Sequence, residues 1–101
     1  MQREALIAKL REHEPELRAA GVISLSLFGS SARNEADPAD VDIAVRLDKG
    51  FSSGGFDYFY ELEQLQRRLS RILGSKVDLV PEPVRKERLQ HEIDRDRALA
   101  F

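Results

Sequence analysis

The chain contains no cysteine, no tryptophan and only two histidines among its 101 residues. The absence of cysteine excludes disulfide scaffolds, cysteine-based zinc sites and catalysis by a thiolate. Two imidazoles are also too few for a site built from several histidines. A metal ion would therefore have to be held by carboxylate oxygens, which favour hard cations such as Mg²⁺.

The sequence also lacks a long apolar run and a strong excess of one charge. No stretch approaches the roughly 20 apolar residues that a membrane helix needs, and the N-terminus lacks the apolar stretch of a signal peptide. We therefore expect a cytoplasmic protein with no membrane partner. The net charge of −2 and the pI of about 5.7 argue against strong direct binding of nucleic acid.

The composition that remains is that of one small globular domain. Hydrophobic residues make up 42% of the chain and charged residues 34%, which is typical of a folded chain and not of a disordered one. A chain of this length can bury one modest core. We predict a single domain over residues 1–101, without room for a second domain that would hold an acceptor.

Hydrophobic periodicity predicts an alternation of helices and strands. In the first predicted strand, Ile23, Leu25 and Leu27 alternate with serines and are expected to face the core. Strands are predicted at 22–28, 40–47, 76–80 and, as a last short one, 98–101. Helices are predicted at 3–13, 31–36, 57–73 and 84–95, with a helical turn before Gly21.

This order, α-β-α-β-α-β-α, and the one-sided strands predict an α+β fold. The sheet should be covered by helices on one face and open on the other. The connection between the second and third strands is long and helical, so these strands are not expected to form a hairpin and the sheet should be mixed. The charged runs 85–88 and 94–97 are interpreted as a solvated helix face.

Three aspartates interrupt the apolar strands. Asp40 and Asp42 are two residues apart in the second strand, so their side chains share a face. Asp78 lies between two apolar residues of the third strand and should point away from the core. If the strands are neighbours the carboxylates converge, and two charges about 4 Å apart repel by roughly 4 kcal/mol. Such a cluster favours a bound cation, although Asp40 alone could be a cap or a turn residue.

A Gly-Ser turn follows the first strand, in the segment 28–33, Phe-Gly-Ser-Ser-Ala-Arg. Gly29 would let the backbone approach a ligand closely, and Ser30 would add a hydroxyl donor at a helix start. Arg33 lies one turn further and could reach a phosphate or an acidic neighbour. The segment is neither a P-loop nor a dinucleotide fingerprint, and a plain helix cap remains the alternative.

Together, the Gly-Ser turn, the Asp-x-Asp pair and the later aspartate resemble the signature of the polymerase-beta-type nucleotidyltransferase superfamily. The form of residues 27–33, closely followed by Asp-x-Asp, is similar to the minimal nucleotidyltransferases (MNT, MntA-like). The resemblance extends from about Leu6 to the C-terminus. Two positions depart from it: Asn34 stands where members often have glycine, and Ala39 where they usually have serine.

The resemblance implies an enzyme that transfers AMP from ATP to a hydroxyl group. It assigns catalytic and metal-binding roles to Asp40, Asp42 and Asp78, which would hold two Mg²⁺ ions, with Mn²⁺ as a substitute. It assigns nucleotide binding to Gly29 and Ser30, which would grip the phosphates, and to Arg33.

The resemblance also implies a partner, a HEPN-type ribonuclease toxin that the MNT protein neutralises as an antitoxin by complex formation and by AMPylation of a toxin tyrosine. Two other functions stay open: a non-catalytic module that acts by contact alone, and a nucleotidyltransferase for a small molecule or an RNA end. Five of the seven aromatic residues lie within 51–60. They either seat the main helix on the sheet or form a partner patch or lid.

Overall fold

The structure is a computed structural model that describes residues 2–33, 40–51 and 57–101. Within these ranges, helices and strands alternate along most of the chain. In order they are α1 (Arg3–Glu12), α2 (Glu14–Ala19), β1 (Val22–Phe28), α3 (Gly29–Ala32), β2 (Asp40–Leu47), α4 (Asp57–Leu73), β3 (Lys76–Pro81), α5 (Glu87–Asp96) and β4 (Ala98–Leu99).

The strands form one mixed sheet in the order β3-β2-β1-β4. β1 runs antiparallel to β2 and to β4, while β2 and β3 are parallel and are connected through α4. The predicted α+β fold with a mixed sheet is confirmed. The helical connection explains the parallel pair, because two parallel strands cannot be joined by a tight turn.

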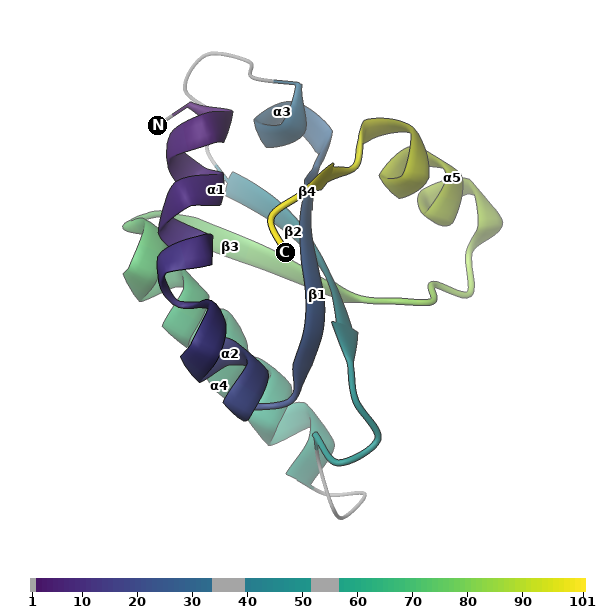
Figure 1. Ribbon diagram of the computed structural model, residues 1–101. Coiled ribbons are helices and arrows are strands. Elements are labelled where there is room, and N and C mark those ends of the chain that lie inside the picture. Colours follow the sequence, from purple (N-terminus) through teal and green to yellow (C-terminus); the bar gives the residue numbers. More distant parts are fainter. Residues whose placement is uncertain (1, 34–39, 52–56) are drawn as a thin grey trace.

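The main hydrophobic core lies between one face of the sheet and the helices α1, α2 and α4, which Figure 1 shows on the same side. The helices contribute leucines, which in α1 and α4 stand at helical spacing and form one buried stripe on each helix. These are Leu6, Leu10, Leu17, Leu65, Leu69 and Leu73. In the described residues, no helix is long and apolar enough to cross a membrane.

The second face of the sheet is not open along its whole length. α5 lies on this side (Figure 1) and buries Ile93 against Phe28 and Ala44 in a smaller apolar cluster. Asp40, Asp42 and Asp78 belong to the same face but stay partly exposed. The open part of the face is therefore the end where β2 and β3 begin.

A polar network fastens α5 to the sheet. The side chain of Glu82, only 1% exposed, accepts two hydrogen bonds from Arg97, at 2.9 and 2.6 Å, and one from Gln90 at 2.8 Å. Arg97 also donates to the Ser26 hydroxyl at 3.1 Å and to Asp94 at 2.9 Å. These bonds hold the pKa of Glu82 below its ordinary value, chiefly through the hydrogen bonds from Arg97.

Some details of the sequence prediction are wrong. The last helix begins at Glu87 and not at 84, and the last strand ends at Leu99 and not at 101. Ile23 is 49% exposed because the pairing of β1 with β2 is irregular between Val22 and Ser24, which breaks the simple alternation. The helix after β1 begins at Gly29 and not at Ser31; the rest of its predicted span, with Asn34 and Ala39, lies outside the described residues.

The aromatic residues near α4 divide between two environments. Phe51 packs against the main core and meets Tyr58 edge to face, with ring centroids 6.0 Å apart. Phe59 and Tyr60 are largely exposed. Some of these rings therefore seat the helix and others do not; Phe56 lies outside the described residues.

Candidate active site

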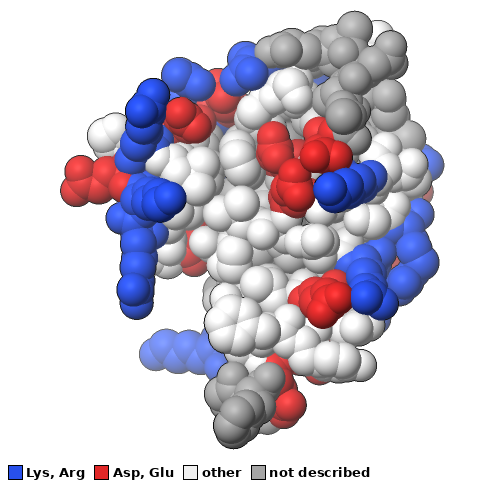
Figure 2. Space-filling model, turned by 180° about the vertical axis from the view of Figure 1, so that it is seen from behind, with Lys and Arg blue, Asp and Glu red and all other residues white. Residues whose placement is uncertain are grey.

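The two strands place aspartates side by side at the open end of the sheet. Asp42 of β2 is paired directly with Asp78 of β3, and on its other side it is paired with Phe28 of β1. Asp40 precedes Asp42 by two residues and shares its face. The alternate residues Val41 and Val77 are buried in the main core, so the carboxylates must project from the opposite face. Figure 2 shows a compact group of acidic side chains on the face seen there.

The electrostatics of Asp42 follow from this arrangement. Burial raises the pKa of Asp42, and the negative charges of Asp78 and Asp40 raise it further, while the positive charge of Arg33 lowers it. The ionised Asp42 is therefore destabilised by its surroundings. A cation at this end of the sheet would relieve the repulsion.

Asp40, Asp42 and Asp78 offer carboxylate oxygens only, and such donors fit a hard divalent cation. Among the described residues, however, no three acidic, histidine or cysteine side chains are arranged as a ready-made metal site. The paired aspartates are thus neighbouring carboxylates and not a preformed cage.

Gly29 occupies the position between the end of β1 and these carboxylates. Its φ angle is +67°, and a β-carbon placed on it would lie 2.6 Å from Oδ2 of Asp42. A side chain here would meet both a left-handed backbone and the carboxylate. The sequence singled out this glycine for the approach of a ligand, but the structure gives it a second reason, the approach of Asp42.

The other residues of the turn differ in their surroundings. Ser30 is partly exposed, whereas Ser31 is buried and its hydroxyl has no hydrogen-bond partner within the described ranges. Arg33 follows α3 and pairs through Nη1 with Oδ2 of Asp96 at 2.7 Å. The carbonyl of Ala32 accepts a hydrogen bond from Arg3 of α1 at 3.1 Å.

Asp96 is the residue at this site that the sequence did not identify. It belongs to a charged run interpreted as a solvated helix face, and for Asp96 that interpretation is wrong because its side chain is only 8% exposed. The run itself carries no signal of burial, since exposed and buried charges look alike in sequence. The available hint was the expectation that Arg33 could reach an acidic neighbour.

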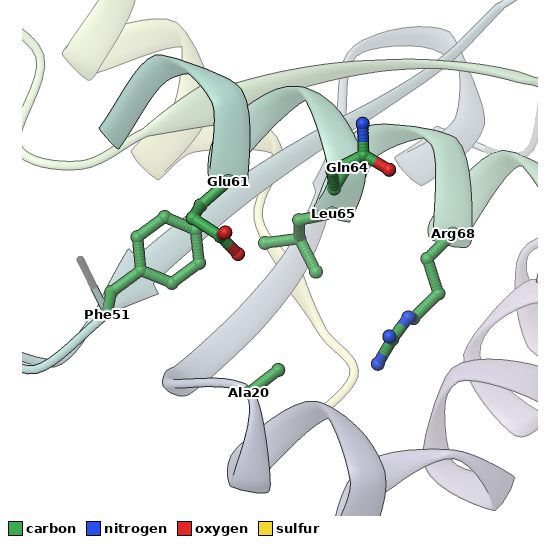
Figure 3. Close-up of a pocket in the computed structure, with 6 residues that line it drawn as sticks. All are labelled: Ala20, Phe51, Glu61, Gln64, Leu65 and Arg68. Carbon is green, nitrogen blue, oxygen red and sulfur yellow. The ribbon is translucent and has the colours of Figure 1, made fainter. Parts of the chain in front are cut away.

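A separate pocket lies between the end of α2 and α4 and contains none of the predicted site residues. In Figure 3 the side chains of Leu65 and Arg68 point from α4 toward the side of Ala20. The pocket holds about 50 Å³, well below the roughly 300 Å³ at which ligand sites begin. This pocket is therefore too small to hold a nucleotide.

The sequence matches a family of known activity. Residues 7–98 match the family model described as nucleotidyltransferase domain. Two proteins of Methanocaldococcus jannaschii, each named as a putative protein adenylyltransferase, are similar in sequence. One is 40% identical over 73 residues, covering 70% of this chain and 69% of the relative; the other is 35% identical over 83 residues, covering 77% and 83%.

Solved structures share the fold. A structure described as a putative minimal nucleotidyltransferase aligns with a TM-score of 0.75 and 27% identity, covering 97% of this chain and 95% of the other. A chain from a complex of a tri-AMPylated Shewanella oneidensis HEPN toxin with an MNT antitoxin aligns with a TM-score of 0.66 and 20% identity, covering 99% and 72%. A chain from a toxin–antitoxin complex with AMP-PNP gives 0.65 and 22%, covering 100% and 73%.

Proposed function

The chain belongs to the nucleotidyltransferase domain family, and on that premise we propose that it transfers AMP from ATP to a hydroxyl group of a partner protein. The observation that carries the proposal is the pairing of Asp42 with Asp78, on the face shared with Asp40 and next to the Gly29–Ser30 turn. The relatives named as protein adenylyltransferases support a protein as the acceptor.

In the proposed reaction, the acceptor oxygen attacks the α-phosphorus of ATP. A new P–O bond forms, the bond to the β-phosphate oxygen breaks, and pyrophosphate leaves with the electron pair. Asp40, Asp42 and Asp78 would hold Mg²⁺, which when bound neutralises phosphate charge and lowers the pKa of a hydroxyl.

The remaining roles belong to the side chains themselves. Asp78, on the β3 side of the group, orients the acceptor hydroxyl and takes its proton. Ser30 donates to the phosphates, and the guanidinium of Arg33 offsets their charge. Most of the catalytic effect then comes from orientation and charge complementarity.

We place the partner among the HEPN-type toxins, with this chain as the antitoxin and a toxin tyrosine as the acceptor. The support is the fold shared with the MNT antitoxin complex, whose toxin is described as AMPylated.

The test is to incubate the chain with Mg²⁺, ATP labelled at the α-phosphate and a HEPN-type protein encoded next to it. We expect label on the partner and, by mass spectrometry, an added AMP on a tyrosine. Asp42→Asn should abolish the transfer, whereas Glu63→Gln, which removes an exposed carboxylate of α4, should not. A stable complex without label would favour the contact-only antitoxin, and label on RNA or on a small molecule would favour the other transferase.

A further inference from the structure

Asp96, the last residue of α5, carries a charge although little of its side chain meets solvent. Its carboxylate accepts hydrogen bonds from Arg33 at 2.7 Å and from Arg95 at 3.2 and 3.3 Å. The hydrogen bond from Arg95, followed by the charges of Arg95 and Arg33, holds the pKa of Asp96 below its ordinary value. Asp96 is therefore an anion at neutral pH.

The position of Asp96 is fixed by its neighbour in sequence. Arg97 makes the paired hydrogen bonds to Glu82 at the end of β3 and a further bond to Ser26 of β1. Two hydrogen bonds between a guanidinium and a carboxylate fix direction as well as distance. The end of α5, with Asp96, is thereby fastened to β1 and to the residue that follows β3.

Arg33 interacts both with this fixed anion and with Asp42 of β2. It pairs with Asp96, which is 63 residues away in sequence. Its positive charge also lowers the pKa of Asp42. A guanidinium next to several carboxylates is drawn toward them, and contact with them would occupy the oxygens that a metal ion needs.

We infer that Asp96 is a positioning residue that holds the guanidinium of Arg33 beside the nucleotide phosphates and away from Asp40, Asp42 and Asp78. The inference rests on the proposed function, in which Arg33 contacts the phosphates. Without Asp96, Arg33 would lose the ion pair that draws its guanidinium away from these aspartates. Mg²⁺-ATP would then bind more weakly, because the guanidinium would be displaced from the phosphates and would neutralise part of the carboxylate charge.

The first measurement is the dissociation constant of Mg²⁺-ATP by calorimetry for wild type, Arg33→Ala, Asp96→Ala and the double variant. We expect Arg33→Ala to weaken binding about tenfold and Asp96→Ala about threefold or more. The double variant should bind no more weakly than Arg33→Ala alone, because Asp96 acts through Arg33. If the double variant instead lost affinity by the product of the two single losses, the inference would be overturned, because Asp96 would then act independently of Arg33.

Arg95→Ala is the matched control, because it removes the other cation on Asp96 and leaves the pair with Arg33. It should bind Mg²⁺-ATP like wild type, and a loss equal to that of Asp96→Ala would overturn the inference. The side-chain Nη–H signals of Arg33, which belong to the group that donates to Asp96, give a readout independent of ATP when observed by NMR in ligand-free protein. They should be sharp in wild type and in Arg95→Ala, and broadened or shifted in Asp96→Ala; unchanged signals would overturn the inference.

These outcomes separate the positioning role of Asp96 from the proposed function. If wild type transfers no AMP but the NMR signals respond as expected, the proposed function is wrong and the positioning of Arg33 by Asp96 is confirmed. If wild type transfers AMP and Asp96→Ala binds Mg²⁺-ATP unchanged, the positioning role is wrong and the proposed function stands.

Discussion

At the scale of single residues, a comparison of Gly29 with Gly74 separates the cost of backbone strain from the cost of a steric contact. Both have left-handed backbones, with φ of +67° and +68°, but a β-carbon on Gly74 would meet nothing within 4 Å. Gly74→Ala should therefore cost about 1 kcal/mol from backbone strain alone. Gly29→Ala should cost about 2–3 kcal/mol, since the new methyl must also displace the Asp42 carboxylate.

Urea unfolding of the two glycine variants measures this difference. Equal losses would show that Asp42 moves aside at no cost. Mg²⁺-ATP binding gives a second comparison: Gly29→Ala should weaken it, whereas Gly74→Ala should not.

The residues of the site were predictable to different degrees. Asp42 and Asp78 could be placed on one face because a charged residue at an apolar strand's alternate position has only one direction to point. Their direct pairing depends on the register of two strands that are joined through a whole helix, and the local sequence does not fix it. Asp96 was missed because its burial depends on α5 meeting the end of α3, a contact between distant parts of the chain.

At the scale of elements, α4 protects the outer edge of the sheet at β3. The hydroxyl of Ser70 accepts a hydrogen bond from the backbone N–H of Val77 at 3.1 Å, and the Gln66 side chain accepts one from the N–H of Leu79 at 3.3 Å. Side chains of the helix thus satisfy donors that an edge strand would otherwise leave unpaired.

Ser70→Ala should lower the free energy of unfolding by about 1 kcal/mol, because the N–H of Val77 loses its acceptor. Ser31→Ala is the matched control: the Ser31 hydroxyl is buried but has no partner within the described ranges, so its removal should be neutral or stabilising. Thermal or urea unfolding of both variants decides the point. A loss in Ser31→Ala as large as in Ser70→Ala would contradict it.

Long periodic elements were predictable, and short or irregular ones were not. The boundaries of α4 agree with the prediction over 57–73 because its leucine stripe is long and its end is marked by Gly74. α3 has a single turn, too short to show a period, so its start was misplaced by two residues. The irregular pairing at Ile23 involves the partner strand and leaves no mark in the sequence of β1.

At the scale of the whole molecule, repulsion among Asp40, Asp42 and Asp78 should lower the free energy of unfolding, and a bound cation should restore it. Because the pKa of Asp42 is raised in the folded protein, its ionisation opposes folding at neutral pH, and protonation at lower pH removes that opposition. Asp42→Asn should therefore raise the melting temperature by a few degrees in EDTA. Mg²⁺-ATP should raise the melting temperature of wild type and have far less effect on the variant.

Thermal melts of both proteins, each in EDTA and in Mg²⁺-ATP, test this expectation. Glu63→Gln, which removes an exposed charge paired with Arg67 on α4, is the control and should respond to Mg²⁺-ATP as wild type does. An Asp42→Asn protein that is less stable in EDTA and gains as much from Mg²⁺-ATP as wild type would rule out the converging carboxylates.

The pairing of β1 with β4 also sets an order of events during synthesis. β1 lies inside the sheet, and its Leu25 exchanges backbone hydrogen bonds with Ala100 and Phe101, which the ribosome adds much later. Ala100 is itself fully buried in the main core. Until these residues emerge, β1 has one unsatisfied edge and the core has an open side, so the nascent chain cannot complete its fold in the order in which it is made.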